Sequence, residues 1–295
     1  MKIAILLTCF NRKEKTLRCL KSVCESYRKS NSDIEYDIYL TDDGSTDGTQ
    51  KAILDFNVSG KIVVLNGTGN LFWNGGMNNS WDYASAHGCY DGYLWLNDDS
   101  TVYPQFWKDL IVTDEFCRSK YGIGGIYVGS TCDPQTKKFT YGGFKFIDKI
   151  SLKDEFVKPN GDEPLECECG HGNITFVSSD VEKKMGHLYR KYRHGGGDHD
   201  YTYTAFKRKL PVLVMPHYAG ECENDHLSNP KSEFENLGIR DRLKFLFSPL
   251  GYNLYNTLIF NRRCFPYRYP FVLLAGMMRV ALPTMYRKIY LSLRK

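Results

Sequence analysis

The sequence contains ten cysteines but no CxxC pair, and no apolar run long enough to cross a membrane. The closest cysteines are Cys167 and Cys169, a spacing that does not indicate a zinc site. We therefore expect reduced thiols in a reducing compartment. The most apolar stretch, 269–278, has ten residues, whereas a membrane-spanning helix needs about 20. The start, MKIAILLTCFNRKEK, turns polar too early for a signal peptide and predicts a first strand.

Acidic residues are nearly absent from the last part of the chain. Residues 240–295 hold eleven Lys or Arg and one acidic residue, Asp241, which leaves 28 basic and 33 acidic residues elsewhere. A basic tail on an acidic body predicts a polyanionic partner. Because aromatic residues alternate with Leu, Ile and basic residues, and no nucleic-acid motif is present, we expect an anionic membrane surface and no nucleic acid. An amphipathic helical cap over the core is the alternative.

The first hundred residues alternate between short apolar runs and helical patterns. Helices are expected from about Asn11, from Ser45 or Thr46, and from about Gly76. Such alternation predicts an α/β fold with a mostly parallel sheet flanked by helices. The four predicted strands cover residues 2–8, 34–41, 61–65 and 92–97.

The second half of the chain is less regular. Strands are expected at 121–129, 139–147, 173–177 and 210–215. A loop is expected at 151–170, because that stretch is rich in charge, Pro and Gly. From about residue 231 the pattern is helical and basic. We therefore predict a catalytic domain at 1–230, with a nucleotide-binding half (1–100) and an acceptor-binding half (101–230), followed by an amphipathic, membrane-associating extension at 231–295.

Polar clusters follow each of the first four predicted strands. They are Thr8–Arg12, Asp42–Ser45, Asn66–Asn74 and Asn97–Ser100. Ligands bind open α/β sheets beyond the carboxyl ends of the strands. The sequence therefore predicts one binding site along this rim.

The segments TCFNR, TDDGSTDGT, GNLFWNGGMNN and LWLNDDS, which begin at residues 8, 41, 69 and 94, together resemble the inverting family 2 glycosyltransferases with the GT-A fold. The sequence looks most similar to the rhamnosyltransferase-like members that build bacterial surface polysaccharides. The resemblance extends over roughly residues 1–230. It implies transfer of a sugar from a UDP- or dTDP-sugar to a hydroxyl of a glycan or lipid-linked glycan. It also implies a peripheral location on the cytoplasmic face of the inner membrane.

The same resemblance implies a set of nucleotide-sugar-binding residues. Asp42 matches the residue at the edge of the base, although turn and helix-cap chemistry is an alternative for Asp42 and its neighbours. Trp73 lines the sugar or base pocket or packs in the core. The full set is Thr8, Phe10, Asn11, Arg12, Asp42, Asp43, Asn70, Trp73, Asn74, Gly75, Asn97 and Asp98.

Residues 97–99 occupy the D-x-D position of the family, where a carboxylate holds a divalent cation against the diphosphate. Mn²⁺ or Mg²⁺ suits such an oxygen-rich site. The family's first acidic residue is replaced by Asn97, so Asp99 is the expected metal ligand. His217 follows an apolar strand and matches a family histidine that completes the metal site or contacts the diphosphate.

Asp198 matches the general base that an inverting transferase needs to deprotonate its acceptor. A helix N-cap at 199–208 is the alternative for Asp198. His171 and Asp200 are expected on the acceptor side. Besides Asn97, two further positions depart from the family pattern, with Gly197 in place of Glu and Thr204 in place of Arg.

Two other classes of protein compete with the transferase. A nucleotidyltransferase shares the sheet and the acidic site, but it needs a glycine-rich loop after the first strand, and TCFNRKEK has no glycine. A non-catalytic, membrane-bound carbohydrate or nucleotide-sugar binder is compatible with the departures at 97 and 204. The donor sugar, the acceptor and the oligomeric state are not determined by the sequence.

Overall fold

The computed structural model describes residues 1–56, 60–224 and 234–292. The chain divides into two units. The first unit comprises residues 1–190 and 197–224, and the second comprises 191–196 and 225–295. The boundary predicted at residue 230 lies outside the described residues.

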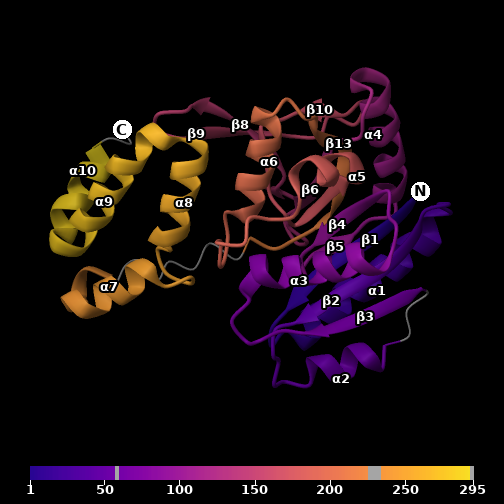
Figure 1. Cartoon of the computed structure of the whole chain (residues 1–295), viewed down its shortest axis with the longest axis horizontal. Helices are drawn as coiled ribbons and strands as arrows, with labels where there is room; N and C mark the ends of the chain where they lie inside the picture. The colour runs from indigo at the N-terminus through magenta and orange to yellow at the C-terminus, as the bar shows by residue number, and fades with distance from the viewer. Residues whose placement is uncertain (57–59, 225–233, 293–295) are drawn as a thin grey trace. The chain divides into compact units, whose positions relative to one another are not determined.

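A ten-stranded sheet forms the centre of the first unit (Figure 1). Its main path has the order β10-β13-β6-β12-β4-β1-β2-β3, with β5 paired to β13 and β7 paired to β6. The strands are β1 (Lys2–Cys9), β2 (Glu35–Asp42), β3 (Lys61–Asn66), β4 (Gly92–Leu96), β5 (Thr101–Val102), β6 (Ile126–Cys132), β7 (Phe139–Tyr141), β10 (Leu165–Glu166), β12 (Ile174–Ser178) and β13 (Val212–Glu221).

The predicted mostly parallel sheet is confirmed. β1 pairs in parallel with both β2 and β4, and β2 pairs in parallel with β3. β12 lies antiparallel between β4 and β6, and β13 runs parallel to β6. Because β12 is reversed, its first residues lie at the same edge as the carboxyl ends of β1, β2 and β4.

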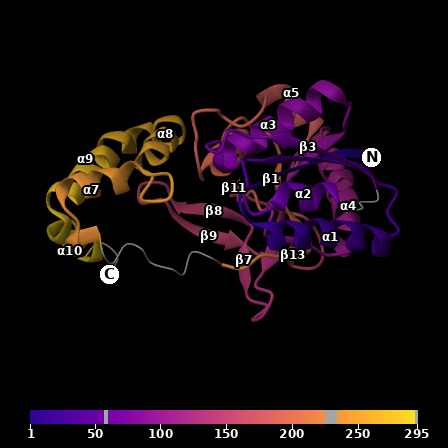
Figure 2. The same ribbon diagram turned by 90° about the horizontal axis from the view of Figure 1, so that it is seen from below.

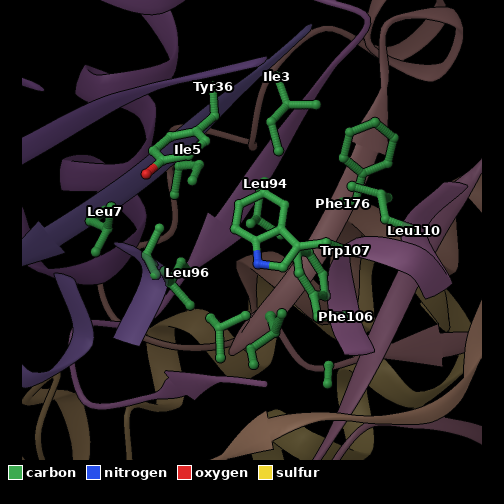
Figure 3. Packing of buried hydrophobic residues seen from close by; sticks show 14 of the residues in the cluster. Ile3, Ile5, Leu7, Tyr36, Leu94, Leu96, Phe106, Trp107, Leu110 and Phe176 are labelled. Atoms are coloured by element: carbon green, nitrogen blue, oxygen red, sulfur yellow. The ribbon is translucent and has the colours of Figure 1, made fainter. Parts of the chain in front are cut away.

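Helices cover both faces of this sheet, and the alternation of side chains along β1 explains why. Ile3, Ile5 and Leu7 point to one face, where they join buried residues of α1 (Lys13–Ser30) and α4 (Gln105–Tyr121) (Figure 3). Ala4 and Leu6 point to the other, where they meet residues of α3 (Phe72–His87), α5 (Ser179–Met185) and α6 (Gly197–Lys207). Figure 2 shows α3 and α5 on the side of the sheet opposite α1 and α4.

A second sheet of three strands belongs to the same unit. Its order is β11-β8-β9, formed by β8 (Gly143–Asp148), β9 (Lys153–Val157) and β11 (Cys169–Gly170). The loop predicted at 151–170 is therefore wrong in part, since it contains β9, β10 and β11. The charged segment 153–155 has no strand pattern of its own and becomes a strand because it pairs antiparallel with β8.

Two predicted helix starts are also wrong, the one at Asn11 and the one at Ser45 or Thr46. Asn11 does not cap α1, because its side chain accepts a hydrogen bond from the Thr46 amide instead. The carboxylate of Asp47 accepts from the first helical amides of α1, at Lys13, and of α2 (Thr49–Leu54). These donors, led by the Thr49 hydroxyl, hold the pKa of Asp47 below its ordinary value. Asp47 therefore joins two loops at the rim of the sheet.

Strand β13 continues past the point where the sequence predicts its end. Proline has no amide hydrogen to donate, so a strand end near Pro216 was expected. The pairing of β13 with β6 instead shifts register between Val214 and Tyr218 and then resumes to Glu221. The strand therefore accommodates Pro216 in an irregularity, and its carboxyl end lies five residues further on.

The second unit is helical, as predicted for the tail. It contains the 3₁₀ turns η3 (Phe234–Asn236) and η4 (Pro266–Arg268) and the helices α7 (Ile239–Phe247), α8 (Leu254–Cys264), α9 (Tyr269–Ala281) and α10 (Pro283–Ser292). Leu246, Leu254 and Val280 form its small core. Residues 191–196 belong here because Asn256 donates to the carbonyl oxygens of His194 and Gly195. No helix in the described part of the chain is long and apolar enough to span a membrane.

Helix α3 approaches β1 so closely that only glycine fits at one position. A Cβ added to Gly76 would lie 2.0 Å from Thr8 Oγ1 and 2.6 Å from its Cβ. The neighbouring Gly75 would meet only the Leu71 side chain, at 3.1 Å.

We predict that Gly76→Ala lowers the free energy of unfolding by about 1–3 kcal/mol, the usual cost of overpacking a core. Gly75→Ala is the matched control, since it adds the same methyl group to the same helix. We expect the control to stay within about 1 kcal/mol of the wild type, because alanine favours helices over glycine by that amount. Urea denaturation of both variants tests this, and equal stabilities would contradict the close approach.

Candidate functional site

Two segments of the predicted rim are joined by one arginine. Arg12 follows β1, and its Nη1 lies 3.2 Å from Asp98 Oδ1 and 2.8 Å from Asp99 Oδ2, both just after β4. Because β1 and β4 pair in parallel, their carboxyl ends meet at this edge of the sheet. The guanidinium group balances part of the negative charge of the two neighbouring aspartates.

The two aspartates differ in their surroundings. Asp98 is buried, and its carboxylate also accepts from the Thr16 hydroxyl at 3.2 Å. Burial raises the pKa of Asp98 to about 6 against the opposing effect of Arg12. The Asp99 side chain is more accessible, with 16% of its surface exposed. Asp99 is therefore the better placed of the two to meet a ligand, and Asp98 holds Arg12 in position.

Cys222 is the neighbour of Asp99 that sequence reasoning missed. Its Sγ lies 3.7 Å from Asp99 Oδ1 and 3.3 Å from Asn173 Nδ2. Burial, followed by the negative charge of Asp99, raises the pKa of this thiol to about 12, so it is a neutral donor at neutral pH. The signal that could have found Cys222 is its position just after the carboxyl end of β13.

The structure gives His217 a partner in α4. This residue lies within β13, and its Nδ1 is 3.1 Å from Oδ1 of the buried Asp109 in α4. Cys222, five residues along the chain, is the β13-side group that contacts Asp99, and five extended residues span roughly 16 Å. His217 and Cys222 therefore lie at different points along the chain, and the contact described beside Asp99 is that of Cys222. The role of His217 at the metal site stays a prediction.

The donor set at Asp98 and Asp99 suits a hard divalent cation. Within residues 1–56, 60–224 and 234–292, no group of three or more His, Cys, Asp or Glu side chains could hold a metal ion. Mg²⁺ and similar ions commonly bind one or two carboxylates and take their other ligands from water and substrate phosphates. The partly exposed Asp99, with the buried Asp98 beside it, satisfies that requirement, whereas a structural zinc site would not be satisfied.

The two adjacent aspartates at the end of β2, Asp42 and Asp43, make different hydrogen bonds. Asp43 is buried and accepts four backbone amides of the following loop, those of Thr68, Gly69, Leu71 and Phe72. Both of its oxygens therefore help to hold the shape of that loop, and the contact of Asp43 with the nucleotide stays a prediction. Asp42 is also buried, and its Oδ1 accepts the Ser45 amide at 2.9 Å. The turn chemistry considered as an alternative for Asp42 is therefore present.

Trp73 links the end of β4 to the segment beside Asp198. Its Nε1 donates to Asn97 Oδ1 at 2.7 Å. Its ring lies so close to Gly172 that a Cβ there would come within 2.6 Å of it. The Gly172 amide in turn donates to Asp198 Oδ2 at 2.9 Å. A continuous path of contacts therefore runs from the end of β4 through Trp73 to Asp198.

Asp198 lies in the first turn of α6, beside two histidines. His199 Nε2 is 3.9 Å from Asp198 Oδ2, and the rings of His199 and His171 meet edge to face at 4.8 Å. Burial alone would raise the pKa of Asp198, but His199, His171 and the Gly172 amide together hold it below its ordinary value. The carboxylate is therefore ionised and able to accept a proton. The helix begins at Gly197, so Asp198 is not the N-cap of a helix at 199–208.

The two departures from the family pattern have structural causes. A Cβ at Gly197 would lie 2.1 Å from Asn74 Oδ1, so no larger residue fits there. Asn74 is fully buried and donates to the Tyr189 carbonyl oxygen, and its contact with the nucleotide-sugar stays a prediction. The Thr204 hydroxyl lies 3.3 Å from Asp200 Oδ1. Asp200 is itself buried, and its acceptor-side role stays a prediction.

The remaining predicted residues lie around the same rim. Thr8 is buried under α3, beside Gly76. The amide oxygen of Asn11 accepts a hydrogen bond from the Thr46 amide in the loop after β2. Three other residues follow β1 and β3 and are at least partly exposed: Phe10, Asn70 and Gly75. Among these, Phe10 is half exposed, so it offers a ring at the edge of the site.

Comparison with solved structures shows that the fold is similar to that of S. aureus TarS. S. aureus TarS 1–349 in complex with UDP gives a TM-score of 0.59 at 11% identity, covering 100% of this chain and 91% of that chain. The complex of TarS 1–349 with UDP-GlcNAc gives 0.55 at 12% identity, covering 89% and 71%. At such low identity the likeness concerns the fold alone. No curated protein matches the sequence.

The family model described as glycosyl transferase family 2 matches residues 4–177, which is more than half of the chain. That range includes all four strands whose carboxyl ends form the rim, together with Arg12, Trp73 and Asp99. The match favours the transferase over the nucleotidyltransferase considered above. The chain belongs to glycosyl transferase family 2.

Proposed function

We propose that this chain is an inverting glycosyltransferase that moves a sugar from a UDP- or dTDP-sugar to a hydroxyl of a glycan or lipid-linked glycan. The observation that carries the proposal is the path of contacts at the rim. It joins the Arg12–Asp98–Asp99 cluster, through Asn97 and Trp73, to the ionised Asp198. A transferase needs these two kinds of group, one for the leaving diphosphate and one for the acceptor proton.

The donor side of the proposal rests on the end of β4 and on Arg12. Solved structures of S. aureus TarS 1–349 with UDP and with UDP-GlcNAc support a nucleotide-sugar donor. Asp99 would hold Mn²⁺ or Mg²⁺, with Asp98 beside it, and the cation would neutralise charge on the leaving nucleotide. The Arg12 guanidinium balances part of the negative charge of the same two carboxylates. Asp42, after β2, is the proposed partner of the base.

The acceptor side rests on Asp198. The acceptor oxygen attacks the anomeric carbon on the face opposite the leaving nucleotide, the bond to the diphosphate breaks, and the acceptor proton passes to the carboxylate. His171 lies beside this carboxylate, and its Nδ1 is 2.9 Å from the Gly142 carbonyl oxygen. That contact fixes the ring against the acceptor side of the rim. The excess of basic over acidic residues in 240–295 supports a cytoplasmic, membrane-surface location and a lipid-linked acceptor.

A thermal-shift screen of nucleotide-sugars tests the proposed donor. A ligand that binds only the folded chain stabilises it, by about 2.7 kcal/mol at a hundred times its dissociation constant. We expect UDP- or dTDP-sugars to raise the melting temperature with Mn²⁺ and to do so much less after chelation by EDTA. Purine-nucleotide sugars serve as the control. No shift with any uridine or thymidine donor would contradict the proposal.

We predict that Asp99→Asn abolishes Mn²⁺-dependent UDP binding and leaves the melting temperature of the free protein nearly unchanged. The amide keeps the shape of the side chain but removes the charge that holds the cation. Asp154→Asn, which alters an exposed carboxylate on β9, is the control and should bind UDP like the wild type. Calorimetric titration of both variants measures this, and full UDP binding by Asp99→Asn would exclude Asp99 as a ligand.

We predict that Asp198→Asn lowers turnover by about 10²-fold or more, the usual contribution of a general base. Asparagine can still accept the Gly172 amide, so the fold and the donor affinity should be retained. Single-turnover rates measured beside the UDP dissociation constant separate chemistry from binding. Full turnover in Asp198→Asn, together with loss in Asp200→Asn, would assign the base to Asp200.

A further inference from the structure

The solvent-facing side of α9 is apolar. Phe271, Leu274 and Met277 lie three residues apart along one side, and they are 71%, 56% and 59% exposed. The single charged residue of this helix, Arg279, has its guanidinium 4.4 Å from the centre of the Tyr252 ring. The opposite side of the helix contributes Val272 and Val280 to the small core. A helix that is apolar on both sides normally has both sides covered.

Helix α7 repeats this arrangement. Ile239, Leu243 and Phe247 are four residues apart, so they form one stripe along the helix, and Leu250 lies in the turn that follows it. All four are exposed, whereas Leu246 alone of this helix is buried. The stripe is therefore not needed for the core of the unit.

Exposed basic side chains occur in the same unit as these apolar stripes. The exposed basic residues at positions 239–288 are Arg240, Lys244, Arg262, Arg263, Arg287 and Lys288. In the same range, Asp241 is the exposed acidic residue. Arg240 and Lys244 directly follow Ile239 and Leu243, so positive charge borders the α7 stripe. This combination of apolar stripe and basic border matches the interface of an anionic bilayer, where acyl chains lie beneath negatively charged headgroups.

We propose that the apolar stripes of α7 and α9 insert into the surface of an anionic membrane leaflet, with the basic residues on its headgroups. The helices have 9 and 13 residues, so they lie in the interface and do not cross the bilayer. This inference rests on the membrane location proposed above and not on the sugar-transfer chemistry. It adds the means of attachment, which is insertion of named apolar side chains together with attraction by charge.

Co-sedimentation of the full chain with vesicles tests the insertion. The vesicles contain phosphatidylglycerol and phosphatidylcholine, or phosphatidylcholine alone as the uncharged control. We expect the wild type to bind the anionic vesicles and to keep a measurable part of that binding in high salt. The triple variant Phe271→Ser, Leu274→Ser, Met277→Ser should bind at least tenfold more weakly. Leu54→Ser changes an exposed leucine on α2 of the first unit and should bind like the wild type.

A second variant keeps the test decisive if the triple variant does not fold. All four tryptophans of the chain lie at positions 73, 81, 95 and 107, in the first unit. Phe271→Trp therefore adds a reporter on α9, and its emission should shift to shorter wavelength with anionic vesicles. An unshifted emission would overturn the insertion.

Two further outcomes would also overturn the inference. Wild-type protein that stays in the supernatant would remove the membrane partner. A dimer detected by light scattering without vesicles, and dissociated by the triple variant, would make the stripes an interface with a second copy. UDP binding measured on the same samples reports separately on the proposed transferase. Vesicle binding without nucleotide binding would leave the inference intact and remove the transferase.

Discussion

The parallel pairing of β1 with both β2 and β4 is the constraint on which the site depends. Parallel strands bring their carboxyl ends to one edge, so the polar residues that follow them meet there. Arg12 reaches the aspartates that follow β4 only because β1 and β4 end together. The reversed strand β12 adds Gly172 and Asn173 to this edge, because its beginning lies where its neighbours end.

The carboxylates at this edge of the sheet have different roles, since several hold loops in place by accepting hydrogen bonds. Asp43 accepts four loop amides, and Asp47 accepts the first amides of two helices. Asp98 is buried beside Thr16 and Arg12. These residues fix the loops, and they leave Asp99 and Asp198 as the carboxylates suited to a cation and a proton. Buried and fully bonded groups hold a fixed geometry, which a site for a charged donor requires.

Trp73 links the donor side of the site to the acceptor side. One tryptophan bonds Asn97 on the donor side and packs against Gly172, whose amide bonds Asp198 on the acceptor side. Asn97, which stands where the family has an acidic residue, accepts the hydrogen bond of this indole N–H. Gly197, which stands where the family has Glu, leaves the space that the Asn74 side chain fills.

The sequence by itself determined the first four strands, their helices and the rim, because apolar runs and turn residues are local signals. It also determined the family, through motifs that each follow a strand. Only the tertiary structure decided which side chains face the site. It gave Asp43, Asn74, Asp200 and His217 partners within the chain and placed Cys222 beside Asp99, because hydrogen bonds between distant segments have no local pattern. It also decided the strand at 153–157 and the course of β13 past Pro216, since strand pairing depends on a partner elsewhere in the chain.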